Sequence, residues 1–203
     1  MKLYYKPGAC SLASHIALYE TGTDFAVEAV DTDAGRTETG ADFRAINPKG
    51  YVPALQLAGG EVLTEGAAVL QWIADRHPGA GLAPEAGSLE RARLQEALNW
   101  ISSELHKAFG PLFRPSATEE ESARARLQVA AKFDRAEALL KEDRDWLVAG
   151  RFSVADAYLF AVVNWANFTG IDLARWPALA AHGARVAARA SAQKALKAEG
   201  LIQ

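Results

Sequence analysis

Residues 2–20 read KLYYKPGACSLASHIALYE, and this stretch decides the class of fold. The apolar and aromatic run at 2–6 predicts a short β-strand, which the Pro7-Gly8 pair ends. Residues 11–20 then predict a helix, because apolar side chains recur there at helical spacing. The stretch therefore predicts a strand, a tight turn and a helix, with Cys10 at the junction between turn and helix.

The pattern continues to residue 78 with further strands and helices. The expected elements are strands at 25–30, 54–57 and 61–63, one helical turn that ends at Ile46, and a helix at 65–77 that Thr64 caps and Pro78 ends. The order is β-α-β-α-β-β-α, and mixed strands and helices in that order predict a small three-layer α/β domain over residues 1–78.

The second part of the chain has a different character. Residues 79–88 are rich in Pro, Gly and Ala, and we expect a linker there. Beyond them no strand pattern is visible, so residues 89–203 predict an all-α helical bundle. The expected helices lie at 89–113, 118–141, 153–168 and 177–189.

Composition narrows the class of protein. Of the 203 residues, 50% are hydrophobic and 23% are charged, as in ordinary soluble proteins. The formal net charge of −3 argues against a polycationic nucleic-acid binder. The uncharged run 157–171 is too short and too polar to span a membrane, and we expect no signal peptide. One cysteine excludes a disulfide scaffold and predicts a reduced, cytoplasmic setting.

Cys10 is the first candidate for chemistry. At a helix N-terminus a thiol meets unpaired N–H groups and the positive end of the helix dipole, which predicts a pKa below ~8.5. The alternative is a small buried hydrophobe, the commoner fate of a lone cysteine, but the position favours reactivity. Because no second cysteine exists, any disulfide must form with a small thiol or another chain.

Two loops carry candidate ligand-binding groups. A cis bond at Val52-Pro53 would leave the Val52 backbone free to pair with an extended peptide-like ligand, whereas a trans bond would be ordinary. Thr64-Glu65-Gly66 opens a helix whose free N–H groups attract a carboxylate, while Glu65 accepts from an ammonium. Together these groups suit the zwitterionic end of an amino acid; the alternative is that Glu65 only complements the helix dipole.

A polar helix face is the third candidate. Asn99, Ser103 and His106 fall at i, i+4 and i+7, with Lys107 beside them. A solvated face is the default interpretation. However, Asn and Ser are poor helix formers, and Glu or Lys would suit a solvent-exposed helix face better. The four histidines show no metal-ligand spacing, so we expect no metal. Dinucleotide, P-loop and nucleophile-elbow motifs are also absent.

Four motifs together carry a family resemblance. They are PGACSLASHIAL at 7–18, NPKGYVPAL at 47–55, LTEGAAVLQWIA at 63–74 and SVAD at 153–156. In the last, Ser153 and Asp156 are also placed to form a capping box. The chain resembles the cytosolic glutathione S-transferases, and most closely the bacterial beta class, in order and over its whole length.

The resemblance implies a fold and an activity. It implies a thioredoxin-like N-terminal domain, an all-helical C-terminal domain and a homodimer. The implied enzyme conjugates reduced glutathione, its co-substrate, to a small hydrophobic electrophile, with possible thiol–disulfide exchange through Cys10. The alternatives are a ligandin-type protein that stores hydrophobic ligands and a non-enzymatic interaction module; the intact Cys10, Glu65 and His106 argue against the module.

The resemblance also implies site residues. Cys10, Ser11 and His106 would be catalytic, with Cys10 facing the glutathione sulfur and able to form a mixed disulfide with it. The implied glutathione site consists of Cys10, Tyr51, Val52, Pro53, Glu65, Gly66, Asn99, Ser103, Glu104, His106 and Lys107, of which Asn99, Ser103 and Glu104 would reach it across the dimer interface.

An apolar groove for the second substrate is expected in the helical half. Its candidates are Phe109, Phe113, Trp165 and Phe168, for which plain core packing is the alternative. The chain also departs from the family pattern at three positions. Gly66 stands where Ser is common, and Ser14 stands where Pro is common. Arg36 is displaced by one position from the usual basic residue, and it is the candidate that the resemblance offers for the glycine carboxylate of glutathione.

Overall fold

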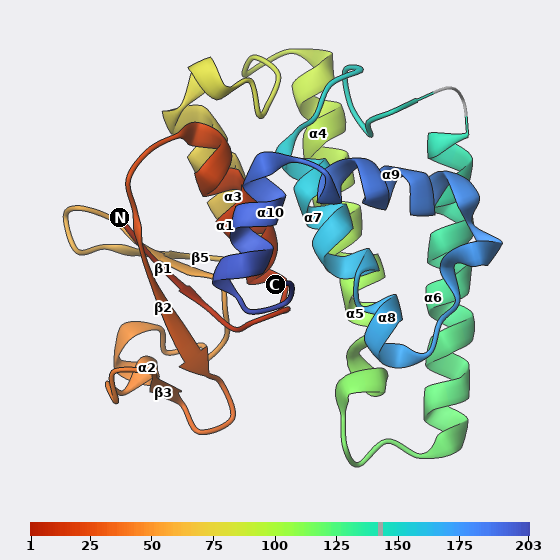
Figure 1. Ribbon diagram of the computed structural model, residues 1–203, viewed down its shortest axis with the longest axis horizontal. Helices are drawn as coiled ribbons and strands as arrows, with labels where there is room; N and C mark the ends of the chain where they lie inside the picture. The colour runs from red at the N-terminus through yellow and green to blue at the C-terminus, as the bar shows by residue number, and fades with distance from the viewer. Residues whose placement is uncertain (142–143) are drawn as a thin grey trace. The chain divides into compact units, whose positions relative to one another are not determined.

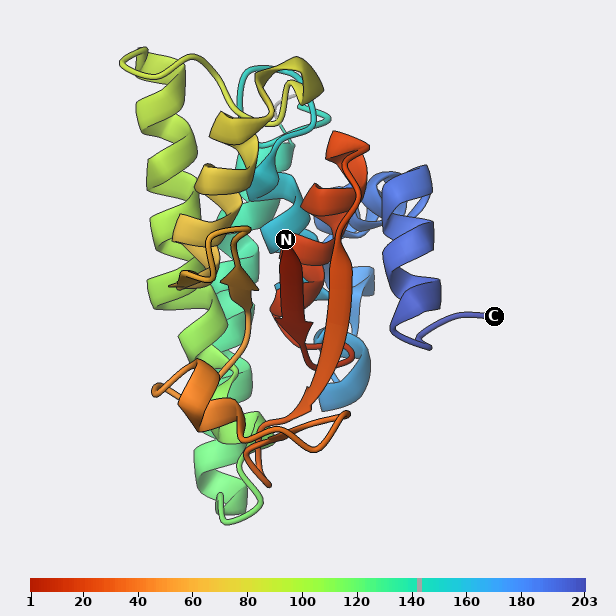
Figure 2. The same ribbon diagram turned by 90° about the vertical axis from the view of Figure 1, so that its left-hand side faces the viewer.

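The computed structural model describes residues 1–141 and 144–203, which form two compact units. The first unit contains residues 1–83 and 188–203, and the second contains residues 84–187. Figures 1 and 2 show their elements. Within the described residues no helix is both long and apolar enough to cross a membrane.

A mixed five-stranded sheet in the order β3-β2-β1-β4-β5 forms the centre of the first unit. Its strands are β1 (Lys2–Tyr5), β2 (Ala26–Asp31), β3 (Arg36–Thr37), β4 (Ala54–Gln56) and β5 (Val62–Thr64). β1 and β2 run parallel and side by side (Figure 2), and every other pairing is antiparallel. The sequence predicted four of these strands; β3 lies in the polar stretch after β2, where two residues carry too little pattern to be seen.

Helices cover both faces of this sheet. They are α2 (Phe43–Ile46) on one face and α1 (Ser11–Thr21) and α3 (Gly66–Arg76) on the other. The 3-10 turn η1 (Pro78–Ala80) and α10 (Ala190–Ala198) pack on these helices. Successive side chains of β1 point to opposite faces. Tyr4 packs on Phe43 of α2 with ring centroids 5.7 Å apart, whereas Tyr5 lies 5.4 Å from the ring of His15 in α1. The predicted three-layer, thioredoxin-like arrangement is therefore confirmed.

The end of the chain packs on α1, as Figure 1 shows for α10. Arg189 donates two hydrogen bonds to the Glu20 carboxylate, from Nε at 2.7 Å and from Nη2 at 3.0 Å. The buried Glu199 carboxylate contacts His15 Nδ1 at 3.0 Å and accepts from the Gly8 N–H at 2.9 Å. The sequence predicted residues 188–203 as part of the helical domain, whereas their packing on α1 places them in the first unit.

All regular elements among the described residues of the second unit are helical. Its elements are α4 (Leu89–Trp100), a π-helical turn η2 (Ile101–Leu105), α5 (His106–Ala108), η3 (Gly110–Phe113), α6 (Glu119–Leu140), α7 (Val154–Val163), α8 (Ala166–Thr169), η4 (Leu173–Arg175) and α9 (Pro177–Ala187). Two predicted helices are thus interrupted. The one at 89–113 passes through the π turn and a 3-10 turn at Gly110-Pro111, and the one at 153–168 breaks between α7 and α8.

Asp156, in the first turn of α7, is a fully buried acceptor for several parts of this unit. It forms the predicted capping box with Ser153, whose N–H and hydroxyl both donate to Asp156 Oδ2, at 2.9 and 2.7 Å. Asp156 Oδ1 accepts from the Leu147 N–H at 2.9 Å and lies 2.9 Å from His182 Nε2. One carboxylate therefore joins the loop before α7, α7 itself and α9.

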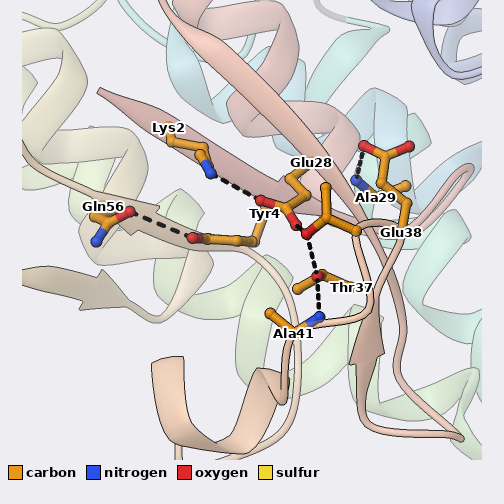
Figure 3. A network of polar contacts seen from close by, with 9 residues as sticks. Lys2, Tyr4, Glu28, Ala29, Thr37, Glu38, Ala41 and Gln56 are labelled. Carbon is orange, nitrogen blue, oxygen red and sulfur yellow. Dashed lines mark hydrogen bonds and ion pairs between the residues drawn. The ribbon is translucent and has the colours of Figure 1, made fainter.

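A second buried carboxylate, Glu28 of β2, organises polar contacts on the sheet (Figure 3). Lys2 Nζ donates to Glu28 Oε2 at 2.8 Å, and the Thr39 hydroxyl donates to Oε1 at 2.5 Å. These hydrogen bonds, first Lys2 and then Thr39, lower the pKa of Glu28 to about 2. Thr37 continues the chain of contacts by accepting from the Ala41 N–H at 3.1 Å. The network fixes the segment between β2 and α2.

The contacts of Asp156 predict a graded loss of stability. Ser153→Ala should lower the free energy of unfolding by about 1 kcal/mol, the usual value of a helix cap. Asp156→Ala should cost at least about 3 kcal/mol, because it strands several buried donors at once. Urea unfolding measures both. Thr118→Ala, at the exposed capping box of α6, is the control and should resemble Ser153→Ala. Equal midpoints for wild type and Asp156→Ala would contradict this role.

Glu28 predicts a pH-dependent part of the stability. Its folded pKa of about 2 lies below the ordinary value of 4.5, so its contribution is complete above pH 4.5 and is lost as the pH falls through 2. Glu28→Gln should therefore lower the free energy of unfolding by about 2–3 kcal/mol at pH 7 and by almost nothing near pH 2. Denaturant titrations at several pH values test this, with the exposed Glu61→Gln as control. A pH-independent loss would show that the pairing is unimportant.

Candidate functional site

The turn between β1 and α1 presents Cys10 directly before the helix. Gly8 adopts φ +72°, a left-handed conformation that favours glycine, and its N–H is held by Glu199. The buried Ser11 hydroxyl bonds both main-chain groups of Lys6, at 3.3 and 3.4 Å. Ser11 therefore closes the turn on the end of the strand, and Cys10 is left half-buried at the N-cap position of α1.

The Cys10 thiol faces the loop that leads into β4. Cys10 Sγ donates to the Val52 carbonyl at 3.4 Å, and the Val52–Pro53 peptide bond is cis. The loop is shaped by Asn47, whose side-chain Nδ2 donates to the Tyr51 carbonyl at 2.7 Å and whose Oδ1 accepts from the Lys49 N–H at 3.1 Å. Two of the motifs quoted from the sequence thus meet at one contact between a thiol and a backbone carbonyl.

Glu65 lies where β5 turns into α3, in an unusual backbone conformation. Its φ of +69° is rare for a residue other than glycine and costs of order 1–3 kcal/mol. Its side chain makes no capping hydrogen bond to α3. Instead, Glu65 Oε1 accepts from the Tyr51 hydroxyl at 2.5 Å and from Lys49 Nζ at 2.6 Å. The interpretation of Glu65 as a mere dipole partner therefore does not describe its side chain.

The cluster favours the protonated forms of Lys49 and Tyr51. The hydrogen bond to Glu65 is the largest cause that raises the pKa of both the Lys49 ammonium and the Tyr51 hydroxyl. Lys49 Nζ also donates to the Thr64 hydroxyl at 3.1 Å. The Lys49 and Glu65 side chains are 47% and 57% exposed, so the pair is accessible to a ligand.

Other sequence candidates of the first unit lie in local structure. Gly66 begins α3. Arg36 is exposed in β3 and its Nη1 donates to the Gly40 carbonyl at 3.1 Å, inside its own turn. Ser14 is fully buried in α1, and its hydroxyl oxygen has no hydrogen-bond partner there.

An aromatic cluster surrounds His106 in the second unit. His106 Nδ1 lies 3.1 Å from the Tyr158 hydroxyl, and its ring packs edge-on against Trp165 with centroids 4.8 Å apart. Phe109 and Phe113 flank the same indole at 5.5 and 5.3 Å. The cluster thus gathers three of the four aromatics predicted to line an apolar groove, and the Trp165 indole is in ring contact with both phenylalanines and with His106.

Exposure divides the four predicted aromatics into two pairs. Phe109 and Trp165 are buried, at 0% and 6% exposure, as core packing requires. Phe113 and Phe168 are 49% and 63% exposed, which is high for phenylalanine. Of the four predicted aromatics, only Phe113 and Phe168 therefore expose a large apolar surface.

His106 carries no charge at neutral pH. Burial lowers its pKa to about 4, and the neighbouring positive charge of Lys107 contributes in the same direction. A neutral imidazole has one donor and one acceptor nitrogen, so His106 is suited to hydrogen bonding rather than to ion pairing.

The remaining predicted residues follow His106 along the interrupted helix. Asn99, Ser103 and Lys107 are exposed on α4, the π turn and α5. Glu104 is also exposed and pairs with Lys132 of α6 at 2.5 Å, which lowers the pKa of Glu104. Among the described residues no group of three metal-binding side chains occurs.

Two partners in the first unit escaped the sequence analysis. Lys49 lies within the NPKGYVPAL motif, but nothing in the sequence indicates that it pairs with Glu65. Glu199 lies 191 residues from Gly8, and no local pattern points to that contact.

Comparison with known proteins identifies relatives over the whole chain. Residues 8–76 match the family model "Glutathione S-transferase, N-terminal domain", and residues 100–190 match "Glutathione S-transferase, C-terminal domain". Glutathione S-transferase GstA of Escherichia coli O157:H7 is 48% identical over 201 residues, which cover 99% of this chain and 100% of the relative.

Solved structures agree with these matches. A sphingomonad glutathione S-transferase complexed with glutathione superimposes with a TM-score of 0.96 at 48% identity, covering 100% of both chains. The bacterial beta class glutathione S-transferase of Sphingomonas chungbukensis gives a TM-score of 0.97, also at 48% identity and full coverage of both chains.

The low pKa of His106 predicts its titration. In a pH series of imidazole NMR signals, the His106 resonances should stay constant from pH 8 to about 5 and shift only near pH 4. Because this pKa lies below the ordinary 6.5, stability linked to His106 is present above pH 6.5 and is lost as the pH falls through 4. His106→Gln assigns the signal, and the urea-unfolded chain is the control. A midpoint near 6.5 in the folded protein would refute the neutral state of His106 at pH 7.

Proposed function

The chain belongs to the glutathione S-transferase family, and on that premise we propose which of its residues serve the reaction and what Cys10 adds to it. It is a transferase of the beta class type that uses glutathione as co-substrate. We assign glutathione binding to the loops of the first unit, and an apolar electrophile to the aromatic cluster of the second. The assembly that we propose is a homodimer.

The observation that carries the glutathione assignment is the contact between Cys10 and Val52. Glutathione is an extended tripeptide, and its central cysteinyl unit can pair with the exposed backbone of a loop. In our proposal that unit pairs with Val52, between Tyr51 and Pro53. Because Cys10 Sγ lies 3.4 Å from the Val52 carbonyl, a cysteinyl unit bound there brings its own sulfur close to the Cys10 thiol.

We assign the γ-glutamyl end of glutathione to the start of α3. It carries one ammonium and one carboxylate. The Glu65 carboxylate, which already binds a cation, is the acceptor that we assign to the ammonium. The first N–H groups of the helix, from Gly66 onward, suit the carboxylate. Arg36 is the candidate for the glycine carboxylate at the other end.

Two different sulfurs then carry two different reactions. In conjugation the nucleophile is the glutathione thiolate, which attacks an electrophile held by apolar side chains such as Phe113 and Phe168. We assign hydrogen bonding toward bound ligand to the neutral His106 and to Lys107, Asn99, Ser103 and Glu104 on the same stretch of helix. In thiol–disulfide exchange the nucleophile is Cys10.

The exchange step balances without a further reactant. The Cys10 thiolate attacks one sulfur of oxidised glutathione, and a new disulfide forms between Cys10 and that half of the molecule. The old disulfide breaks, and the other half leaves as glutathione thiolate, which takes up the proton that Cys10 released. Because the chain has one cysteine, only an external thiol can reverse the step.

The two reactions should separate in a variant of Cys10. Oxidised glutathione should add one glutathionyl group to the wild type, visible by intact mass and removed by dithiothreitol. Cys10→Ala should lose both the adduct and thiol-transferase activity, yet still conjugate glutathione to an aryl halide, since that nucleophile belongs to the substrate. Cys10→Ser is the matched control for the size of the side chain and should behave in the same way.

Two results would count against this assignment. If the wild type takes up no glutathione and its thiol reacts with Ellman's reagent only after unfolding, Cys10 is inert. If Cys10→Ala also loses conjugation while its unfolding midpoint is unchanged, the two reactions share one nucleophile.

A further inference from the structure

Lys49 and Glu65 form an ammonium–carboxylate pair at the place assigned to the ammonium of glutathione. Lys49 Nζ lies 2.6 Å from Glu65 Oε1 and 3.1 Å from the Thr64 hydroxyl. The site is therefore occupied by a cation of the same chemical kind as the one that the ligand brings. The Tyr51 hydroxyl donates to the same Glu65 oxygen, and Lys49 Nζ lies 5.9 Å from the centroid of the Tyr51 ring.

We propose that Lys49 is a resident substitute for the γ-glutamyl ammonium, which holds Glu65 in the free protein and is displaced when glutathione binds. This inference rests on the assignment of Glu65 proposed above. It makes Lys49 a specificity-determining residue, because a ligand without an ammonium leaves the Lys49–Glu65 pair in place.

The geometry explains why a resident cation is useful. The backbone of Glu65 adopts φ +69° at the turn from β5 into α3, which sets the point from which its side chain extends. Two donors on Oε1, from Lys49 and Tyr51, keep the side chain oriented there. The free site is thus preorganised for a cation, which reduces the ordering that binding requires.

The same geometry makes Lys49 easy to displace. Its side chain is 47% exposed, and exposed ion pairs contribute little because water and salt screen them. The lysine stem is flexible, and a displaced ammonium is readily hydrated. Tyr51 differs, since its rigid ring can keep donating to Glu65 while Lys49 leaves.

An opposite role for Lys49 makes the inference testable. If Lys49 stayed in place and only oriented Glu65, its removal would weaken the contact between Glu65 and the ligand ammonium. If Lys49 competes with that ammonium, its removal strengthens the contact. The two roles therefore predict opposite signs for the coupling between Lys49 and the ligand ammonium.

The experiment measures that coupling by isothermal titration calorimetry. Dissociation constants are compared for glutathione and for glutaryl-cysteinyl-glycine, which lacks only the ammonium, in wild type and in Lys49→Met. Salt near 1 M shortens the Debye length to about 3 Å and removes long-range charge effects. We expect the ratio of the two constants, analogue over glutathione, to rise about two- to fivefold in Lys49→Met. A ratio that is unchanged or falls overturns the inference.

Two further variants separate the possible failures. Lys6→Met removes an equally charged lysine of the same unit, 40% exposed and paired with Asp33, and should leave the ratio at its wild-type value. Glu65→Gln should bring the ratio close to one. If the ratio stays large in Glu65→Gln, the assignment of Glu65 itself fails. If the ratio falls in Glu65→Gln but does not rise in Lys49→Met, only the role of Lys49 fails. Unchanged melting temperatures verify that each variant is folded.

Discussion

The antiparallel register of β1 against β4 is the constraint on which the thiol site depends. Leu3 pairs with Leu55 and Tyr4 pairs with Ala54. The turn that follows β1 and the loop that precedes β4 therefore lie at the same end of these two strands. Cys10 belongs to the first segment and Val52 to the second, and only this register brings Sγ within 3.4 Å of the carbonyl. A slip of one residue would turn Leu3 and Leu55 away from the core and separate the two segments.

Burial determines what an ion pair does in this protein. Lys2 and Glu28 form a pair in which the carboxylate side chain is only 7% exposed, and the contact holds one segment of the sheet in place. Lys49 and Glu65 form a pair of the same chemistry and similar length, but both side chains are about half exposed. Removal of Lys2 would leave the buried Glu28 carboxylate without its cation and would lower stability, whereas the exposed Glu65 can exchange its cation with solvent and ligand.

The second unit separates its polar centre from its aromatic cluster. Asp156 is buried at the start of α7 and is satisfied by groups from neighbouring segments, which suits a purely structural role. His106 lies among aromatic rings with Tyr158 near one nitrogen, and burial keeps it neutral. A neutral hydrogen-bonding group beside exposed apolar surface such as Phe113 is compatible with an apolar substrate, whose binding a charged group would oppose.

Local patterns determined the parts of this protein that near neighbours decide. The strand, turn and helix at 2–20, the position of Cys10 at a helix N-terminus and the capping box at Ser153 all depend on residues a few positions apart, and each was predictable. The tertiary structure alone decided which groups meet: Lys49 with Glu65 across 16 residues, Glu199 with Gly8 across 191, and residues 188–203 with the first unit. The physical reason is that periodicity and caps are short-range, whereas the partner of a side chain is set by how the whole chain closes on itself.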